Sequence, residues 1–280
     1  MRILRVNCNG WHLGSLALFS LFSCGALAQA LPAGSKYVAL GSSFAAGPGI
    51  PVQQATCGRS DHNYAHLVAS ALSLKLVDVS CSGATTAHVL DSAQGDAPPQ
   101  LNAVTADTRL VTLTIGGNDM SYTGSTGKCS GAKPEDHCAS KIDQAAIAAV
   151  VRQLPSRLAF VINAIKAKAP NAVIVLVPYP QVVPAPAQRC ADLGLTDEDA
   201  NYIALLGEQL ESAFVEAAKT TGIRIADAYV VSNGHGPCAD SGKRWVNGAK
   251  VKDSGANYHP TAEAHVEMAR LVVAALAAVK

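Results

Sequence analysis

The sequence has few aromatic side chains, almost no net charge and no run of basic residues. Phe, Trp and Tyr make up 5% of the 280 residues, and 22 basic residues nearly balance 21 acidic ones. Without a basic surplus the chain has no field to hold a polyanion, so we expect no nucleic-acid partner. The scarcity of aromatics also disfavours a stacking platform for carbohydrates. Because 49% of the residues are hydrophobic, the composition is that of one ordinary globular domain.

The N-terminus carries an apolar stretch that differs from the rest of the chain. Arg2 and Arg5 precede apolar residues 13–27, and the stretch ends in Ala28-Gln29-Ala30. This order is typical of a cleaved secretory signal peptide, and it is short for a membrane span, which needs about 20 apolar residues. We assign residues 1–30 to a signal peptide and 31–280 to one folded domain, with no transmembrane segment. Lipoprotein anchoring through Cys24 is the less favoured alternative, because Phe22 is bulky for that signal.

The cysteines lack the C-x-x-C spacing typical of many zinc sites, so we favour disulfides over a metal. Beyond the predicted signal peptide their number is even, which in an exported chain indicates disulfides and an oxidising compartment. Many pairings are possible. We favour the sequential one, because each bond then closes a single loop region. The expected bonds are Cys57–Cys81, Cys129–Cys138 and Cys190–Cys238.

Short β-rich runs alternate with helical patterns along the whole predicted domain. We expect strands over residues 36–40, 74–79, 109–115, 172–177 and 223–226. We expect helices over residues 63–72, 142–168, 197–220 and 260–279, the second broken or kinked at Pro155. Several strands are apolar on both faces, as in a buried parallel sheet. The alternation predicts an α/β fold, a three-layer α/β/α sandwich with a mostly parallel five-stranded sheet.

Small and polar residues follow the predicted strands, at the sheet edge where open parallel sheets bind their ligands. A hydrolase that works without a metal needs a nucleophile, a base and donors for the oxyanion. Ser43 follows the first strand, Gly83 the second, Asn118 the third, and His259 ends the long segment after the fifth. Each residue alone is ordinary in a turn, so only the set indicates a catalytic site.

These segments together resemble the GDSL-type serine hydrolases, also called SGNH hydrolases. The blocks occur in family order as Gly41-Ser42-Ser43, Cys81-Ser82-Gly83-Ala84-Thr85, Gly117-Asn118-Asp119 and His259-Pro260. Cys57-Gly58-Arg59-Ser60, followed by Tyr64, resembles secreted bacterial lipases and esterases of the family, which carry three sequential disulfides. The resemblance covers nearly the whole predicted domain and implies a flavodoxin-like SGNH fold. We expect no cofactor and no metal, and a monomer.

The resemblance also implies a role for each matching residue. Ser43 would be the nucleophile and His259 the general base and acid. The Ser43 N–H, the Gly83 N–H and the Asn118 amide would form the oxyanion hole. We therefore expect a secreted serine esterase or lipase that cleaves small-molecule or lipid acyl esters through an acyl-enzyme. The alternatives are an acetyl-carbohydrate esterase and a secreted binding module whose catalytic site has decayed.

Two positions depart from the family pattern. The family has Asp before the serine where this chain has Ser42, which leaves Ser42 as an alternative nucleophile. The family also has Asp three residues before the histidine, where this chain has Ala256; Asp253 lies six residues before His259. We favour a dyad with His259 oriented by the Ala256 carbonyl over a triad with Asp253 as third member. The apolar, proline-rich segment 177–186 is expected either to contact an acyl chain or to pack on itself.

Overall fold

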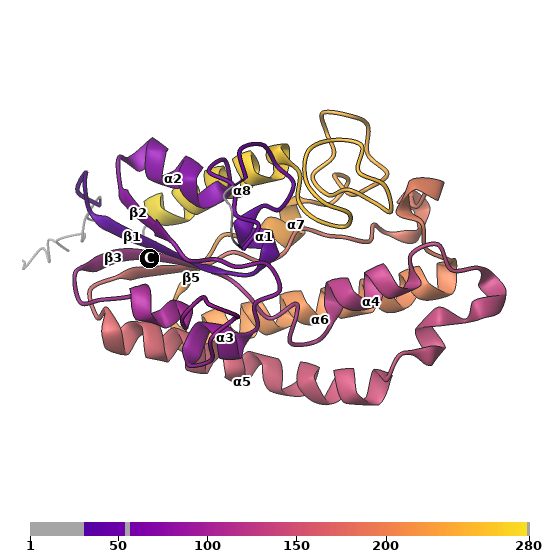
Figure 1. The fold of residues 1–280 in the computed structure, drawn as a ribbon, viewed down its shortest axis with the longest axis horizontal. Helices are drawn as coiled ribbons and strands as arrows, with labels where there is room; N and C mark the ends of the chain where they lie inside the picture. The colour runs from indigo at the N-terminus through magenta and orange to yellow at the C-terminus, as the bar shows by residue number, and fades with distance from the viewer. Residues whose placement is uncertain (1–30, 54–56, 279–280) are drawn as a thin grey trace, which may run out of the picture.

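The computed structural model describes residues 31–53 and 57–278, so the predicted signal peptide lies outside the described residues. The strands are β1 (Lys36–Gly41), β2 (Lys75–Asp78), β3 (Thr108–Thr114), β4 (Val173–Leu176) and β5 (Arg224–Ile225). They form one parallel sheet in the order β2-β1-β3-β4-β5, shown in Figure 1. This is the flavodoxin-like order. The predicted α/β sandwich with a five-stranded sheet is confirmed.

Helices cover both faces of the sheet, because alternate residues of a strand point to opposite sides. From β1, Tyr37 and Ala39 join one buried cluster while Val38 and Leu40 join another. The first cluster lies under α2 (Tyr64–Leu72), α7 (Ala228–Val231) and α8 (Ala262–Ala277). The second lies under α3 (Thr86–Leu90), α4 (Tyr122–Cys129), α5 (Gln144–Lys168) and α6 (Asp197–Thr221). Figure 1 shows α2 and α8 above the sheet and α3, α5 and α6 below it.

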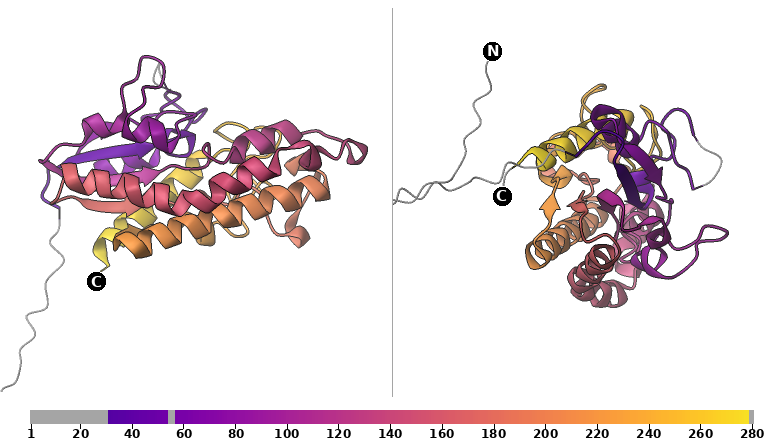
Figure 2. Two further views of the ribbon diagram at one scale, coloured as in Figure 1. Left: turned by 90° about the horizontal axis from the view of Figure 1, so that it is seen from below. Right: turned by 90° about the vertical axis from the view of Figure 1, so that its left-hand side faces the viewer.

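Helix α5 runs without interruption through Pro155, so of the predicted break or kink the break is wrong, and the kink stays a prediction. Proline removes one backbone hydrogen bond, but Leu154 and Leu158 on either side are fully buried and hold the helix on the core. Figure 2 shows α5 lying alongside α6.

Among the described residues, α5 is the one helix whose length and composition would suffice to cross a membrane. Its buried apolar residues pack into the core described above.

The three expected disulfides are present. Cys57–Cys81 joins the segment before α2 to the segment after β2, and Cys129–Cys138 joins the end of α4 to a short 3-10 helix. Cys190–Cys238 joins the segments that follow β4 and α7. The sequential pairing predicted from the cysteine order is confirmed. Each bond closes a loop region, and such a bond typically contributes about 2–4 kcal/mol to stability.

The carboxyl group of Glu211, on α6, is buried without a hydrogen-bond partner among the described residues. Burial, with a smaller contribution from Asp227, raises the pKa of Glu211 from 4.5 to about 8. The folded state therefore holds this proton more tightly than the unfolded chain, and stability falls as pH rises between those two values. We expect Glu211→Gln to melt at a higher temperature than wild type at about pH 8, with a smaller difference at about pH 5.

Thermal melts followed by circular dichroism at both pH values test this expectation. Glu208→Gln, at an exposed position of the same helix, is the control for removing one negative charge from α6. If Glu211→Gln and wild type melted at the same temperature at about pH 8, the carboxylate would carry no penalty in the folded state.

Candidate active site

Ser43 stands at the carboxyl end of β1, where the backbone is held from both sides. Gly41 has φ +151°, and a Cβ there would lie 2.6 Å from the Thr114 carbonyl oxygen of β3. The Gln100 side chain accepts from the Gly41 N–H at 2.8 Å and donates to its carbonyl at 2.9 Å. Ser42 N–H then donates to Thr114 O at 2.9 Å, and α1 (Ser43–Ala46) begins. The first residue of this helix is thus fixed at the sheet edge.

The His259 ring reaches Ser43 from the loop that precedes α8. Its Nε2 lies 2.9 Å from Ser43 Oγ, and its Nδ1 lies 2.7 Å from the Asn257 carbonyl oxygen. A carbonyl only accepts, so Nδ1 carries the proton and Nε2 accepts from the Ser43 hydroxyl. Burial lowers the pKa of His259, partly offset by the Asn257 bond. The neutral ring is therefore set to take a proton from Ser43.

The carbonyl that orients His259 differs from the predicted one. The Ala256 oxygen accepts the backbone N–H of His259 itself at 3.2 Å, so it closes a tight turn. The ring folds back onto the Asn257 oxygen instead. Tyr258 between them has φ +57°, a left-handed conformation that is uncommon outside glycine. A backbone carbonyl orients the His259 ring as predicted, but it is the carbonyl of Asn257 and not that of Ala256.

Asp253 is not brought to His259. Its carboxylate pairs with the buried Arg244 guanidinium at 2.6 Å and accepts from Ser241 Oγ at 3.2 Å. Arg244 also donates to the carbonyls of Pro237 and Ala239. Asp253 therefore fastens the loop before His259. Among the described residues its carboxylate makes no hydrogen bond to the His259 ring, which fits the favoured dyad.

We expect Asp253→Ala to keep kcat within about tenfold of wild type, equivalent to under about 1.4 kcal/mol of barrier. Loss of the carboxylate leaves Arg244 with its two carbonyl acceptors. The free energy of unfolding should fall by about 1.5–3 kcal/mol, the range for a hydrogen bond to a charged group. Urea unfolding and initial rates on one ester measure both quantities. A loss of about a thousandfold in the folded variant would show that Asp253 acts as a triad carboxylate.

Ser42 points away from the imidazole. Its hydroxyl lies 2.7 Å from the Tyr179 hydroxyl, and both side chains are buried. Gly117 N–H donates to the same tyrosine oxygen at 3.3 Å. Ser42 therefore serves the packing between β1, β3 and β4, and the geometry favours Ser43 over Ser42 as nucleophile.

The proline-rich segment after β4 packs into the core. Val177, Tyr179, Val182 and Val183 are buried, so most of it does not line an open surface. Of its two expected roles, packing on the protein itself fits these residues. Tyr179, which holds Ser42, was not foreseen as a site residue, because its partner lies far away in the sequence.

The segments after β2 and β3 meet the segment after β1. Cys81 N–H donates to Gly41 O at 3.0 Å, and Asn118 Nδ2 donates to Ala84 O at 2.8 Å. The second Nδ2 hydrogen of Asn118 is left over, because an amide nitrogen carries two. Within the described residues, neither the Ser43 N–H nor the Gly83 N–H donates to a protein acceptor. The three predicted oxyanion donors thus come from segments that are bonded together.

Asp119 holds the segment after β3 against α3. Its carboxylate accepts from the Thr86 backbone N–H at 3.0 Å and from the Thr86 hydroxyl at 2.5 Å. Thr86 begins α3, so the bonds join the segment after β3 to the helix that follows Gly83. Arg157 of α5 lies 3.8 Å from the same carboxylate. Asp119 therefore has a structural part in holding its neighbour Asn118.

The chain is similar to known proteins in both sequence and structure. The profile of the GDSL-like Lipase/Acylhydrolase family matches residues 39–266. Lipase 2 of Streptomyces coelicolor is 34% identical over 270 residues, which cover 91% of this chain and 90% of the relative. An extracellular lipase from Streptomyces rimosus aligns with a TM-score of 0.72 and 29% identity, covering 86% of this chain and 99% of that one. Phospholipase A1 from Streptomyces albidoflavus NA297 aligns with a TM-score of 0.72 and 30% identity, covering 87% of this chain and 100% of that one.

Proposed function

The chain belongs to the GDSL-like lipase/acylhydrolase family and is a carboxylic ester hydrolase, and on this premise we propose that it cleaves acyl esters with Ser43 as nucleophile and His259 as base. The observation that carries the proposal is the hydrogen bond of 2.9 Å between Ser43 Oγ and His259 Nε2. The fixed tautomer of His259 supports it, because Nε2 is free to accept the serine proton.

The reaction proceeds in two halves. Ser43 Oγ attacks the ester carbonyl carbon while its proton passes to His259 Nε2. The oxyanion that forms accepts hydrogen bonds from the Ser43 N–H, the Gly83 N–H and the free Asn118 amide hydrogen. Collapse breaks the bond to the alcohol, which leaves with the proton from His259, and an acyl-enzyme remains. Water, deprotonated by His259, then attacks the acyl carbon. The bond from that carbon to Ser43 Oγ breaks, the acid leaves, and His259 returns the proton to Ser43 Oγ.

We assign the distal part of the substrate to a cavity of about 810 Å³ whose lining includes Cys81, in the turn that carries Gly83, but not Ser43 or His259. Its lining includes Val79, Ala97, Pro98 and Ala103 together with the Cys57–Cys81 disulfide, an apolar wall suited to an alkyl chain. Gln94, which also lines it, lies against Gly83. A small-molecule or lipid acyl ester is therefore the substrate class we favour.

Secretion is part of the proposal. Three disulfides imply an oxidising compartment, and the Streptomyces rimosus relative is described as an extracellular lipase. The predicted signal peptide over residues 1–30 agrees with export.

A series of p-nitrophenyl esters of rising acyl length, alongside an acetylated sugar, tests the substrate class. We expect kcat/KM to be higher for a medium-length acyl chain than for acetate, because the apolar wall contributes only when a chain reaches it. Acetylated sugar as the best substrate would favour the acetyl-carbohydrate esterase instead.

A further inference from the structure

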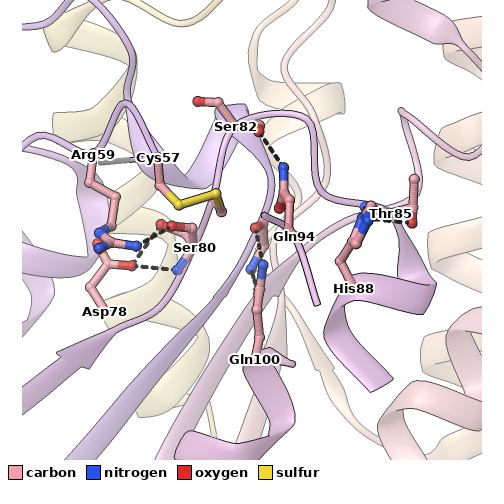
Figure 3. Close-up of a disulfide and its surroundings, with 11 residues drawn as sticks. Cys57, Arg59, Asp78, Ser80, Ser82, Thr85, His88, Gln94 and Gln100 are labelled. Atoms are coloured by element: carbon pink, nitrogen blue, oxygen red, sulfur yellow. Dashed lines mark hydrogen bonds between the residues drawn. A yellow bond between two sulfur atoms is a disulfide. The ribbon is translucent and has the colours of Figure 1, made fainter. Parts of the chain in front are cut away.

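The turn that carries Gly83 is held by a side chain that the catalytic scheme above does not use. Residues Cys81 to Ala84 form a tight turn closed by Ala84 N–H donating to Cys81 O at 3.0 Å. Gln94 Nε2 donates to the Ser82 carbonyl oxygen, in the middle of this turn, at 2.7 Å. Figure 3 shows the Gln94 amide reaching Ser82 beside the Cys57–Cys81 disulfide.

The Ser82 carbonyl and the Gly83 N–H belong to one peptide group. The described residues contain no cis peptide bond, so this carbonyl and this N–H point in opposite directions in one plane. Whatever fixes the direction of the Ser82 oxygen therefore also fixes the direction of the Gly83 N–H.

The Ser82–Gly83 peptide is the central peptide of the turn, and it can flip when the turn changes type. Gly83 has φ +85°, close to the value of about +80° at the third position of a type II turn. In a type I turn the same position has φ of about −90°, and the two types differ by a flip of the central peptide. Glycine takes either sign of φ at little cost. Without an added constraint the Ser82–Gly83 peptide is thus free to reverse the direction of its N–H.

Among the described residues, the Gln94 side chain makes no hydrogen bond other than the one to Ser82. Its Oε1 is buried without a partner among the described residues, so the bond to Ser82 is the one its amide makes there. Its own backbone is fixed, because Gln94 N–H donates to Ala97 O at 2.9 Å and Ala97 N–H donates back at 3.1 Å. A Cβ on Gly83 would lie 3.4 Å from Gln94 Nε2, so the amide lies directly against the turn.

We propose that Gln94 is a positioning residue of the oxyanion hole, which holds the Ser82–Gly83 peptide with its N–H toward the site. The inference rests on the proposed function, in which the Gly83 N–H stabilises the oxyanion. The bond to the carbonyl also polarises the peptide and strengthens its N–H as a donor. In this role Gln94 acts through the Ser82–Gly83 peptide and does not touch the reacting atoms. It also lines the cavity assigned to the acyl chain, so KM is measured beside kcat.

The first test is Gln94→Met, which keeps the length of the side chain and removes the donor. We expect kcat to fall about 10- to 100-fold with KM within about threefold, because one full oxyanion donor is worth about 10²- to 10³-fold. Gln144→Met is the matched control. Gln144 Nε2 makes the same kind of bond, to Ala139 O at 2.8 Å, near the start of α5, and its loss should leave kcat unchanged.

The second variant, Gln94→Glu, gives a readout that a merely structural bond would not move. At about pH 8 the carboxylate has no hydrogen to donate and repels the Ser82 oxygen. As pH falls and the carboxyl is protonated, the donor returns. We therefore expect the kcat of Gln94→Glu, as a fraction of wild type at the same pH, to rise as pH falls from about 8 to about 5.

The outcomes separate the two proposals. If the folded Gln94→Met variant keeps kcat within twofold of an active wild type, or if the Gln94→Glu fraction does not change with pH, the positioning role is overturned and the proposed function stands. If Gln94→Met does not fold, the pH dependence of Gln94→Glu decides alone. If Ser43→Ala retains wild-type activity, the proposed function itself fails.

Discussion

Ser43→Ala is expected to lower kcat by about 10⁴- to 10⁶-fold, the scale seen when a serine hydrolase loses its nucleophile. Alanine has no group that can attack the ester, while the bonds that hold the turn at Gly41 and Ser42 are all made by other atoms. The variant should therefore fold and bind substrate but form no acyl-enzyme. Initial rates on a p-nitrophenyl ester, with a melting curve as the check on folding, measure the effect.

Ser42→Ala is the matched control for this prediction. It removes the same hydroxyl from the neighbouring residue, whose oxygen faces Tyr179 and not His259. We expect turnover within about tenfold of wild type and a stability loss of about 1 kcal/mol for one buried hydrogen bond. A dead Ser42→Ala variant beside an active Ser43→Ala variant would reverse the assignment of the nucleophile.

His259→Ala should reduce kcat by a similar factor, because the serine hydroxyl is a weak nucleophile without a base. The wild-type enzyme gives a second measure. Its base must be neutral, so kcat/KM falls as pH drops through the pKa of His259, which burial lowers below its ordinary value of 6.5. We expect the acid limb of the wild-type profile to lie below about pH 6.5.

His137→Ala controls for the loss of an imidazole. His137 pairs with Glu198 on the surface, and its removal should leave both kcat and the acid limb in place. If the residual activity of His259→Ala showed the wild-type acid limb, another group would be the base.

The sheet could be predicted from the sequence because each strand is a short apolar run that ends in small or polar residues. The long helices followed from their periodicity. The short helix α3 was missed, since five residues, Thr86–Leu90, are too few for a periodic pattern. Local helix chemistry predicts a break or kink at Pro155, but α5 is not broken there, because the burial of Leu154 and Leu158 holds it on the core.

The candidate site also contains residues that the sequence predicts and groups that it does not. The sequence predicts four candidate residues, because each belongs to a short block that matches the family pattern and lies after a predicted strand. They are Ser43, Gly83, Asn118 and His259. The Asn257 carbonyl and the Gln94 amide could not be predicted, since both act through a turn whose geometry the sequence does not state. Every residue has a backbone carbonyl, so residue type cannot indicate which carbonyl orients His259. Gln94 contacts Ser82 only because the loop after α3 folds back onto the turn. The spacing of Asp253 to His259 in the sequence does not show that the Asp253 carboxylate pairs with Arg244.

Covalent labelling with a fluorophosphonate ester tests the central claim most directly. The reagent traps the nucleophile of a serine hydrolase as a stable adduct, and trypsin then releases the peptide Tyr37–Arg59, which contains both Ser42 and Ser43. After reduction of the disulfide to Cys81, fragmentation by mass spectrometry locates the added mass. We predict one adduct, on Ser43, which is absent when His259 is replaced by Ala. An adduct on Ser42, or an active enzyme that takes no label at Ser43, would contradict the account.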